Sequence, residues 1–417
     1  MSRTTILAIT RCLLSGICLG LPARPQSAFD QKLREARYDL RIEGGKLTGG
    51  GGAVLEKAIS GAQYVLIGED HLTREIPQFA SAVCDAMGPQ GLTAMAVEVG
   101  PQVAKMAAAS LGKPDRISRM AALVNRYPDS VAFLNVKQES DLVEHCAEVS
   151  HNPNFHVWGL DQELMGSAGM LLDQILATHP GPSATAVLTR MKSEEQTDAA
   201  QAKETGDPSK VFLFAASDAE LAEGAVMLKR DGNRAANELF QELMESHEIY
   251  LKNMQGLPES NSQRARLMKQ HFRRDLDAAT SNSTRQRVLI KFGDWHLYKG
   301  INPLHQRDLG NYIAEIADGQ GSASLHICIL GAKGTHATYA GYSRPMKLEP
   351  FVMTDDSDYR WLKPVVDNQV SGAWTLYDLR NLRFQKLGAV DPDMERVIYG
   401  YDLLVIVPEL TPADSIH

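Results

Sequence analysis

Short apolar runs recur along this chain, each bounded by turn or helix signals. They are Tyr64 to Ile67, Ala94 to Val97, Phe155 to Trp158, Val288 to Phe292, Leu325 to Leu330 and Leu403 to Val407. Apolar runs of this length are typical of strands buried on both faces of a sheet. Helical patterns such as Ile76 to Met87 and Ser140 to Val149 separate the first runs, which indicates βαβ units. The pattern predicts an α/β fold with a mainly parallel central sheet and flanking helices.

The segment from about Gly166 to Thr284 differs in character: it is charged, rich in Ala and Met, and has few β-branched runs. We predict a large helical insertion here, able to cap or wall a cleft, within one α/β domain of residues 29–417. The part from Lys192 to Pro208 is expected to be a mobile loop. Helical periodicity marks three stretches, Asp218 to Arg230, Asn233 to Gln255 and Ser262 to Ala279.

The N-terminal residues have the pattern of an export signal. Arg3 and Arg11 flank the start, and the apolar run Cys12 to Leu21 leads to Pro22 and a stretch of small residues that ends at Ala28. We expect a signal peptide at residues 1–28 and a periplasmic or secreted mature chain; an uncleaved anchor is the alternative. The run is shorter than the roughly 20 residues that a membrane-spanning helix needs, and no later segment qualifies.

Charge and cysteine content narrow the classes of partner and site. The formal net charge is −8 and no dense Lys/Arg run occurs, so we expect no nucleic-acid partner. The mature chain would keep Cys84, Cys146 and Cys328, an odd and sparse set from which we predict no disulfide framework. No Cys-x-x-Cys pair occurs, which excludes zinc-ribbon and thioredoxin-type sites.

Ionisable residues follow directly after the first four predicted strands. Because ligands of an open parallel sheet bind beyond the carboxyl ends of its strands, these residues should meet at one edge. Turns after strands are often polar, so each motif alone is weak, and their conjunction carries the prediction. The strand ends read Gly68-Glu69-Asp70-His71, Glu98-Val99-Gly100, Gly159-Leu160-Asp161 and Gly293-Asp294-Trp295-His296.

Imidazole and carboxylate groups transfer protons near neutral pH and bind catalytic metals. The candidate catalytic residues are therefore Glu69, His71, Glu98, Asp161 and His296. If a divalent metal is present, its expected ligands are His71, His296 and Glu98. The two histidines are far apart in sequence, yet they should lie within about 10 Å of each other if they cap neighbouring strands.

Two further candidates have equally good structural explanations. Glu75 follows His71 by one helical turn, so it either shares the site or complements the dipole of a helix N-terminus. Arg266 or His271 reaches the cleft from the insertion, unless their helix simply presents a solvated basic face.

With these motifs the sequence resembles the superfamily that joins the erythromycin esterases, the Tiki/TraB proteins and the ChaN-type haem-uptake proteins. The paired Gly-x-x-His motifs and a glutamate resemble the Tiki/TraB pattern of a metal-dependent peptidase. The helical insertion, Gly159-Leu160-Asp161, the run Lys291 to His296 and the later Asp308-Leu309-Gly310-Asn311 are more similar to the erythromycin esterases. Four residues match the superfamily's functional positions, namely Glu69, His71, Glu98 and His296. Looser matches are Asp161, Glu75, Arg266 and Asp294.

The resemblance implies an exported hydrolase acting on a small-molecule or peptide substrate. Water, activated by His71 with Glu69 or by a metal, would attack an ester, lactone or amide carbonyl. A Gly-x-Ser-x-Gly elbow is absent, which argues against an ordinary serine esterase. The ChaN-type resemblance implies a second class, a protein that binds haem or iron without turnover. Tyr298 is then a candidate axial ligand, or a packing residue.

Overall fold

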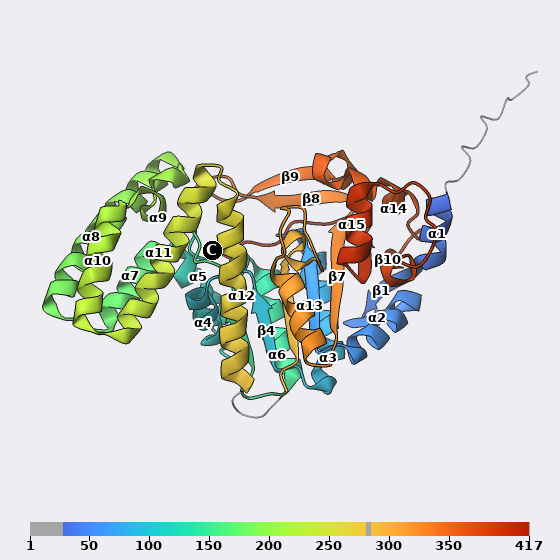
Figure 1. The fold of residues 1–417 in the computed structure, drawn as a ribbon, viewed down its shortest axis with the longest axis horizontal. Coiled ribbons are helices and arrows are strands. Elements are labelled where there is room, and N and C mark those ends of the chain that lie inside the picture. The colour runs from blue at the N-terminus through green and yellow to red at the C-terminus, as the bar shows by residue number, and fades with distance from the viewer. Residues whose placement is uncertain (1–27, 281–284, 417) are drawn as a thin grey trace, which may run out of the picture.

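The computed structural model describes residues 28–280 and 285–416, so the predicted signal peptide lies outside the described residues except for Ala28. Its centre is a nine-stranded sheet with the order β2-β1-β10-β11-β7-β3-β6-β4-β5 (Figure 1). The strands are β1 (Arg37–Glu43), β2 (Lys46–Thr48), β3 (Tyr64–Glu69), β4 (Ala94–Val97), β5 (His156–Gly159), β6 (Val288–Gly293), β7 (Ser324–Gly331), β10 (Trp374–Asp378) and β11 (Leu403–Val407).

The six predicted strands are all present and form the parallel part of the sheet, from β11 through β7, β3, β6 and β4 to β5. This confirms the predicted α/β class. Strands β1, β2 and β10 extend the sheet in antiparallel pairing and were not predicted. Strand β1 is largely polar, with a single buried residue at Leu40, because only part of it faces the core.

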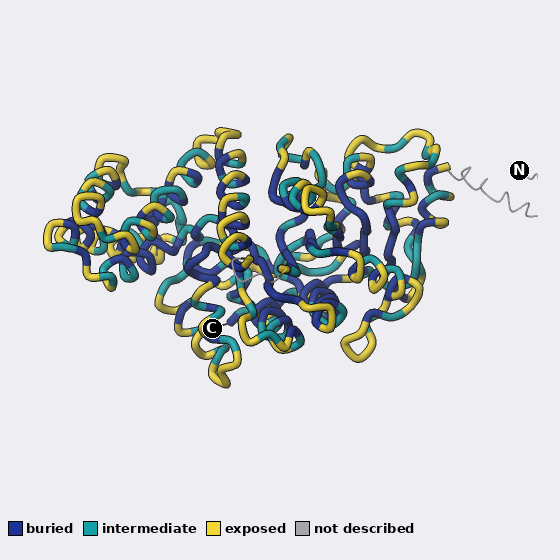
Figure 2. Tube along the Cα trace, turned by 60° about the horizontal axis from the view of Figure 1, so that its bottom comes forward, coloured by how far each residue is buried: buried dark blue, intermediate teal, exposed yellow. Residues whose placement is uncertain are grey.

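Helices cover both faces of the sheet, and the buried residues concentrate between these layers (Figure 2). Alternate residues of each strand serve opposite faces, so Val65 packs with one layer and Leu66 with the other. The first layer contains α2 (Gly49–Gly61), α3 (Glu75–Met87), α4 (Pro101–Ala108), α5 (Arg116–Arg126) and α6 (Lys137–Ser150). The second contains α1 (Ala28–Ala36), α12 (Glu259–Thr280), α13 (Leu309–Gly319), α14 (Lys363–Asp367) and α15 (Pro392–Gly400).

The helical insertion lies between β5 and β6, and most of it forms a lobe beside the sheet with its own apolar core (Figure 1). Helix α12 stands between this lobe and the sheet. The loop expected from Lys192 to Pro208 is wrong: most of it belongs to one long helix, anchored by buried Met191 and Ala202. The lobe helices are α7 (Ala168–Ala177), α8 (Pro182–Thr205), α9 (Phe212–Ala215), α10 (Asp218–Asp231) and α11 (Arg234–Met254).

A two-stranded ribbon, β8 (Lys333–Thr338) and β9 (Lys347–Val352), extends from the sheet toward the insertion (Figure 1). The cysteines among the described residues form no framework of several disulfides, but one bond that the sequence analysis did not foresee joins Cys84 of α3 and Cys146 of α6, with Cα atoms 5.2 Å apart. The two helices pack side by side on the sheet, a proximity that cysteine spacing alone does not reveal. No helix among the described residues is long and apolar enough to cross a membrane.

Candidate active site

The carboxyl ends of four neighbouring parallel strands meet at one edge of the sheet. Glu69 ends β3, Glu98 directly follows β4, and Asp161 follows β5 after one intervening residue. His296 lies in the short 3₁₀ helix η3 (Asp294–Leu297) that follows β6. Since these strands are adjacent and parallel, segments far apart in the sequence deliver their side chains to one place.

Glu98 is the centre of this cluster. Its Oε1 accepts a 2.8 Å hydrogen bond from Arg264 Nη2 and lies 3.6 Å from His296 Nε2. Its Oε2 accepts a 2.6 Å hydrogen bond from the Gly293 amide and lies 3.4 Å from His71 Nε2. Burial raises the pKa of Glu98, but the charges of His71, His296 and Arg264 outweigh burial and hold this pKa well below its ordinary value. The two predicted histidines thus approach opposite oxygens of one ionised carboxylate.

His71 is held on three sides. Its Nδ1 lies 2.9 Å from Glu69 Oε1, and its ring stacks on Phe133 with 4.0 Å between centroids. The side chain remains 26% exposed, against 3% for Glu69 and 5% for Glu98, so the imidazole is reachable from solvent. Burial lowers the pKa of His71, but the carboxylates of Glu98 and Glu69 outweigh this effect and raise it to about 10.

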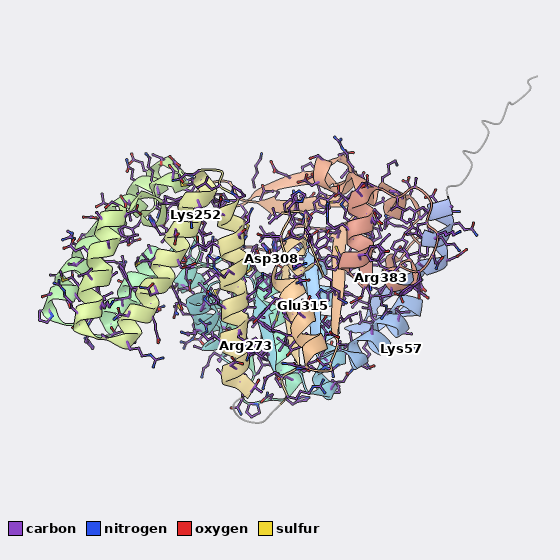
Figure 3. All side chains as sticks on the ribbon, in the orientation of Figure 1. Lys57, Lys252, Arg273, Asp308, Glu315 and Arg383 are labelled. Atoms are coloured by element: carbon purple, nitrogen blue, oxygen red, sulfur yellow. A yellow bond between two sulfur atoms is a disulfide. The ribbon has the colours of Figure 1, made fainter. Side chains whose placement is uncertain are left out.

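His296 is oriented by Asp308, which the sequence analysis named in the motif Asp308 to Asn311 but not as a site residue. Its Nδ1 lies 2.9 Å from Oδ2 of Asp308, which also caps α13 by accepting a hydrogen bond from the Leu309 amide. Figure 3 shows Asp308 near the start of α13. A Cβ on Gly310 would lie 2.3 Å from the Leu297 backbone, so glycine allows this helix to begin against η3.

Burial and the charge of Arg264 lower the pKa of His296. The hydrogen bond to Asp308 and the charge of Glu98 outweigh them, so the net shift is upward. An imidazole held between two carboxylates in this way favours its protonated form.

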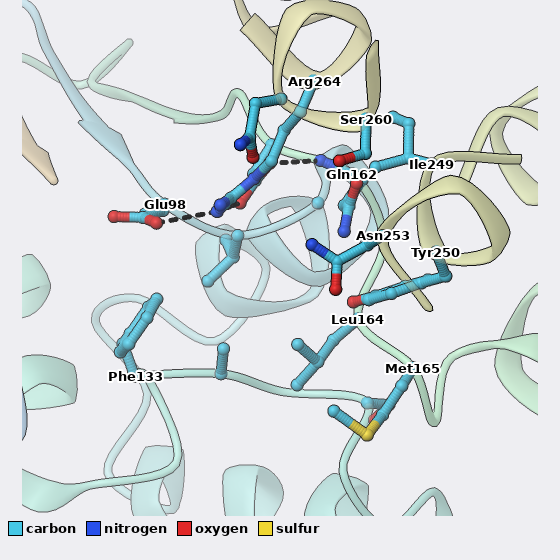
Figure 4. A pocket seen from close by; sticks show the side chains of 16 residues that line it. Glu98, Phe133, Gln162, Leu164, Met165, Ile249, Tyr250, Asn253, Ser260 and Arg264 are labelled. Atoms are coloured by element: carbon cyan, nitrogen blue, oxygen red, sulfur yellow. Dashed lines mark hydrogen bonds and ion pairs between the residues drawn. The ribbon is translucent and has the colours of Figure 1, made fainter. Parts of the chain in front are cut away.

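Arg264, rather than Arg266, reaches the cluster from the insertion. Its Nε donates a 2.9 Å hydrogen bond to Asp161 Oδ1, and its Nη2 binds both Asp161 Oδ2 and Glu98 (Figure 4). Arg266 is exposed on α12. The helical period could have indicated this, because Arg264 lies three, four and seven residues before Leu267, Met268 and His271, which are buried on the same face of α12.

The other secondary candidates lie outside the cluster. Glu75 begins α3 and binds Thr411 through a backbone amide at 2.8 Å and a hydroxyl at 2.6 Å, so it secures the C-terminal segment. His271 is buried, with Nδ1 3.0 Å from Leu160 O, and burial lowers its pKa to about 4. Tyr298 is 2% exposed and packs against Tyr401, as expected if it is a packing residue and not a haem ligand.

Asp294, the second residue of the Gly-Asp-Trp-His motif, is buried beside the cluster. Tyr359 donates a 3.0 Å hydrogen bond to its Oδ1, while Oδ2 has no hydrogen-bond partner among the described residues. Burial raises the pKa of Asp294 to about 7, although the Tyr359 hydrogen bond opposes this shift. Asp294 therefore changes its charge close to neutral pH.

A cavity of about 290 Å³ lies between the strand ends and helices α11 and α12 (Figure 4). It reaches the cluster at Glu98, Asp161 and Arg264, whereas His71 and His296 lie next to Glu98 and do not line it. Glu98 and Arg264 lie on one side of it, and Phe133, Leu164 and Met165 lie on the opposite side (Figure 4). Asp161 also lines the cavity. A second cavity of about 450 Å³ shares Phe133, Leu164 and Met165 with the first. The cluster is thus open to a ligand that combines polar and apolar parts.

The donor set does not fit the metal site expected from the sequence. No group of three or more His, Cys, Asp or Glu side chains in residues 28–280 and 285–416 is arranged to hold a metal ion. Both oxygens of Glu98 already accept hydrogen bonds, one from the Gly293 amide and one from Arg264. A bound cation would have to compete with the guanidinium for that carboxylate, so no step below uses a metal.

The architecture of this chain, a mainly parallel α/β sheet with a helical insertion after β5, is similar to that of three solved structures. A variant of erythromycin esterase EreC in its open conformation superposes with a TM-score of 0.64 at 13% identity, covering 91% of this chain and 99% of that one. The resemblance expected from the sequence is therefore confirmed at the level of the fold.

Two further solved structures share the fold. A succinoglycan biosynthesis protein matches with a TM-score of 0.57 at 16% identity, over 94% of this chain and 99% of that one. A Bacillus cereus protein matches with a TM-score of 0.55 at 14% identity, over 93% and 98%. No protein-family model and no curated protein sequence matches the chain.

Proposed function

We propose that this protein is an exported hydrolase that adds water to an ester, lactone or amide carbonyl. The observation that carries the proposal is the placement of His71 and His296 at opposite oxygens of buried Glu98, which itself lines a cavity. The fold shared with erythromycin esterase EreC supports the same class of reaction.

His71 is the proposed general base. Its Nδ1 is committed to Glu69, so the proton is exchanged at Nε2, next to Glu98. An imidazole whose second nitrogen is fixed by a carboxylate can take a proton from water while that water attacks the carbonyl. The raised pKa of His71 means that the neutral form grows as pH increases.

His296 and Arg264 complete the proposed reaction on the other side of Glu98. His296, held by Asp308 and favoured in its charged form, is placed to donate a proton from Nε2 to the leaving group. Arg264 lines the cavity and is the fixed cation nearest to it, so it is suited to stabilise negative charge that develops on the carbonyl oxygen.

The two adjoining cavities suggest the kind of substrate. The first cavity is lined by the polar residues Glu98, Asp161 and Arg264. The second is lined largely by apolar side chains, such as Val124, Val131, Met346 and Ile416. We therefore expect a substrate whose scissile carbonyl is attached to a sizeable apolar body. A small, fully polar ester would leave the second cavity unfilled.

The decisive experiment is a panel of esters, lactones and short peptides incubated with the mature protein, with and without an added divalent metal. Hydrolysis of one class without added metal supports the proposal, and Glu98→Gln is the matched inactive control. Absence of turnover across the panel, or turnover that survives Glu98→Gln, contradicts it.

Export rests on the N-terminal pattern and on the Cys84–Cys146 disulfide, a bond that persists mainly in oxidising compartments. N-terminal sequencing of the protein from its native host should find a chain that begins near Phe29, outside the cytoplasm. An intact Met1 or Ser2 would contradict cleavage.

A further inference from the structure

A charged side chain lies where the strand pattern demands an apolar one. Lys291 is in β6, paired in register with Ile67 of β3 and Val97 of β4. By strand alternation it shares a face with Leu289, which packs into the apolar layer beneath α3 and α6. Its side chain is only 3% exposed.

Two carboxylates neutralise this lysine, and one of them belongs to the active site. Lys291 Nζ binds Glu69 Oε1, the same oxygen that holds His71 Nδ1. It also lies 2.6 Å from Oε1 of Glu139, a residue of α6 whose side chain is 4% exposed. A continuous chain of contacts therefore runs from α6 through β6 to the imidazole.

The fold does not need such an ion pair. Taking charges out of water is costly, and apolar residues of similar volume are often as stable or more stable in their place. The surrounding layer is apolar and could accept them. The group is therefore better explained by its contact with Glu69 than by its contribution to stability.

We propose that Lys291 and Glu139 are positioning residues for the hydrolytic reaction, which hold Glu69 and, through it, the His71 imidazole in the geometry that proton transfer requires. This inference rests on the proposed function. The positive charge of Lys291 offsets part of the negative charge of Glu69, which makes it easier for His71 to release its proton. The negative charge of Glu139 partly cancels the effect of Lys291.

Because of the charges around these groups, Lys291→Met and Glu139→Gln should shift the pKa of His71 in opposite directions. His71 faces Glu69 of β3, Glu98 after β4 and Asp294 of η3, while Lys291 faces Glu69 and Glu139. Burial raises the pKa of Glu139 to about 7, even though the charge of Lys291 lowers it. Glu139 is therefore ionised over the range in which His71 deprotonates.

The test is the pH profile of kcat/KM for the full mature chain. Lys291→Met removes a positive charge next to Glu69, so the increase of kcat/KM with pH should shift by about one pH unit to higher pH. At a fixed pH below this increase, kcat/KM should therefore be about tenfold lower than in the wild type. Glu139→Gln removes a negative charge and should move the rise to lower pH. Lys291→Arg keeps the positive charge and should therefore have the same pH profile of kcat/KM as the wild type.

A second measurement separates this inference from the proposed function. Ring ¹⁵N NMR titration of His71, assigned by loss of its signal in His71→Asn, should show the same opposite shifts even if no substrate has been found. Failure of the substrate panel together with shifted titrations overturns only the hydrolase proposal.

The control is Lys299→Met, which removes another ion pair. Lys299 Nζ lies 2.7 Å from Oδ2 of Asp402, and Asp402 directly precedes β11, at the amino ends of the parallel strands. Lys299→Met should leave the pH profile unchanged. Both Glu139→Gln and Lys291→Arg must first be shown to fold. If Glu139→Gln then changes neither the pKa of His71 nor the pH profile of kcat/KM, the two residues are structural and the inference is wrong. The same conclusion follows if Lys299→Met moves the profile equally.

Discussion

The backbone amide of Gly293 donates a 2.6 Å hydrogen bond to Oε2 of Glu98, which joins the ends of β6 and β4 directly. A Cβ at position 293 would lie 2.9 Å from His71 Nε2 and 3.5 Å from Glu98 Oε2. The glycine therefore leaves the space that Nε2 of His71 occupies.

Gly293→Ala should displace His71 from Glu98 and lower turnover by about 10²-fold, because misplacement of a reacting group by about 1 Å costs that much. The melting temperature should change little. Gly319→Ala, whose added Cβ meets nothing within 4 Å, is the control and should keep full activity. Equal activity of the two variants would show that His71 does not act from this position.

His71→Ala and His296→Ala should each lower turnover by about 10² or more, the usual scale for losing a general acid or base. The double variant should be hardly worse than the worse single variant, because residues that serve one step are not additive. Steady-state kinetics on a confirmed substrate measures this, with circular dichroism to verify folding. Wild-type activity of both single variants would make the histidines structural.

Arg264→Gln and Arg266→Gln form a matched pair on one helix. The first leaves Glu98 and Asp161 without their shared cation, so it should lower turnover by about 10² or more and destabilise the protein by about 1–3 kcal/mol. The second affects an exposed side chain and should stay within about 0.5 kcal/mol of wild type with normal turnover. Urea unfolding and kinetics distinguish them; similar behaviour would contradict the assigned role of Arg264.

Activity and stability should depend on pH in opposite directions. Burial lowers the pKa of His71, but Glu98 and Glu69 raise it from 6.5 to about 10. A raised folded-state pKa stabilises the protein fully below pH 6.5, and this contribution is lost as pH rises toward about 10. Over the same range the neutral base accumulates, so kcat/KM should increase.

Thermal unfolding at pH 6 and at pH 9.5 tests the stability part of this prediction. The melting temperature of the wild type should fall more between these values than that of His71→Asn, which lacks the titrating group. An equal fall in both proteins would show that His71 is not perturbed as described.

The Cys84–Cys146 disulfide should contribute about 2–4 kcal/mol to stability, mainly by restricting the unfolded chain. The double substitution Cys84→Ser/Cys146→Ser, compared with wild type in urea with and without a reductant, measures this contribution. Turnover of the folded variant should be retained. An unchanged midpoint on reduction would mean that the bond is absent from the mature protein.

The sequence by itself determined the parallel sheet and the edge at which the chemistry gathers. A strand buried on both faces needs a continuous apolar run, so β3, β4, β6, β7 and β11 are recognisable locally. The edge strand β5 is only half buried and was found from its short run Phe155 to Trp158. The residues that follow the parallel strands must share an edge. The helical insertion was equally clear, because a period of 3.6 residues repeats through most of it.

Only the tertiary structure decided which side chains act together. Arg264 contacts Glu98 across 166 residues, Lys291 contacts Glu69 across 222, and Cys84 and Cys146 are 62 residues apart. Asp308 is only 12 residues from His296, but the turn between η3 and α13 decides that they meet. Lys291 is the one charged residue in the apolar run Val288 to Phe292, but its partner Glu139 lies on another element. Burial and pairing depend on which surfaces the folded chain brings together, and periodicity along the sequence carries no information about such distant contacts.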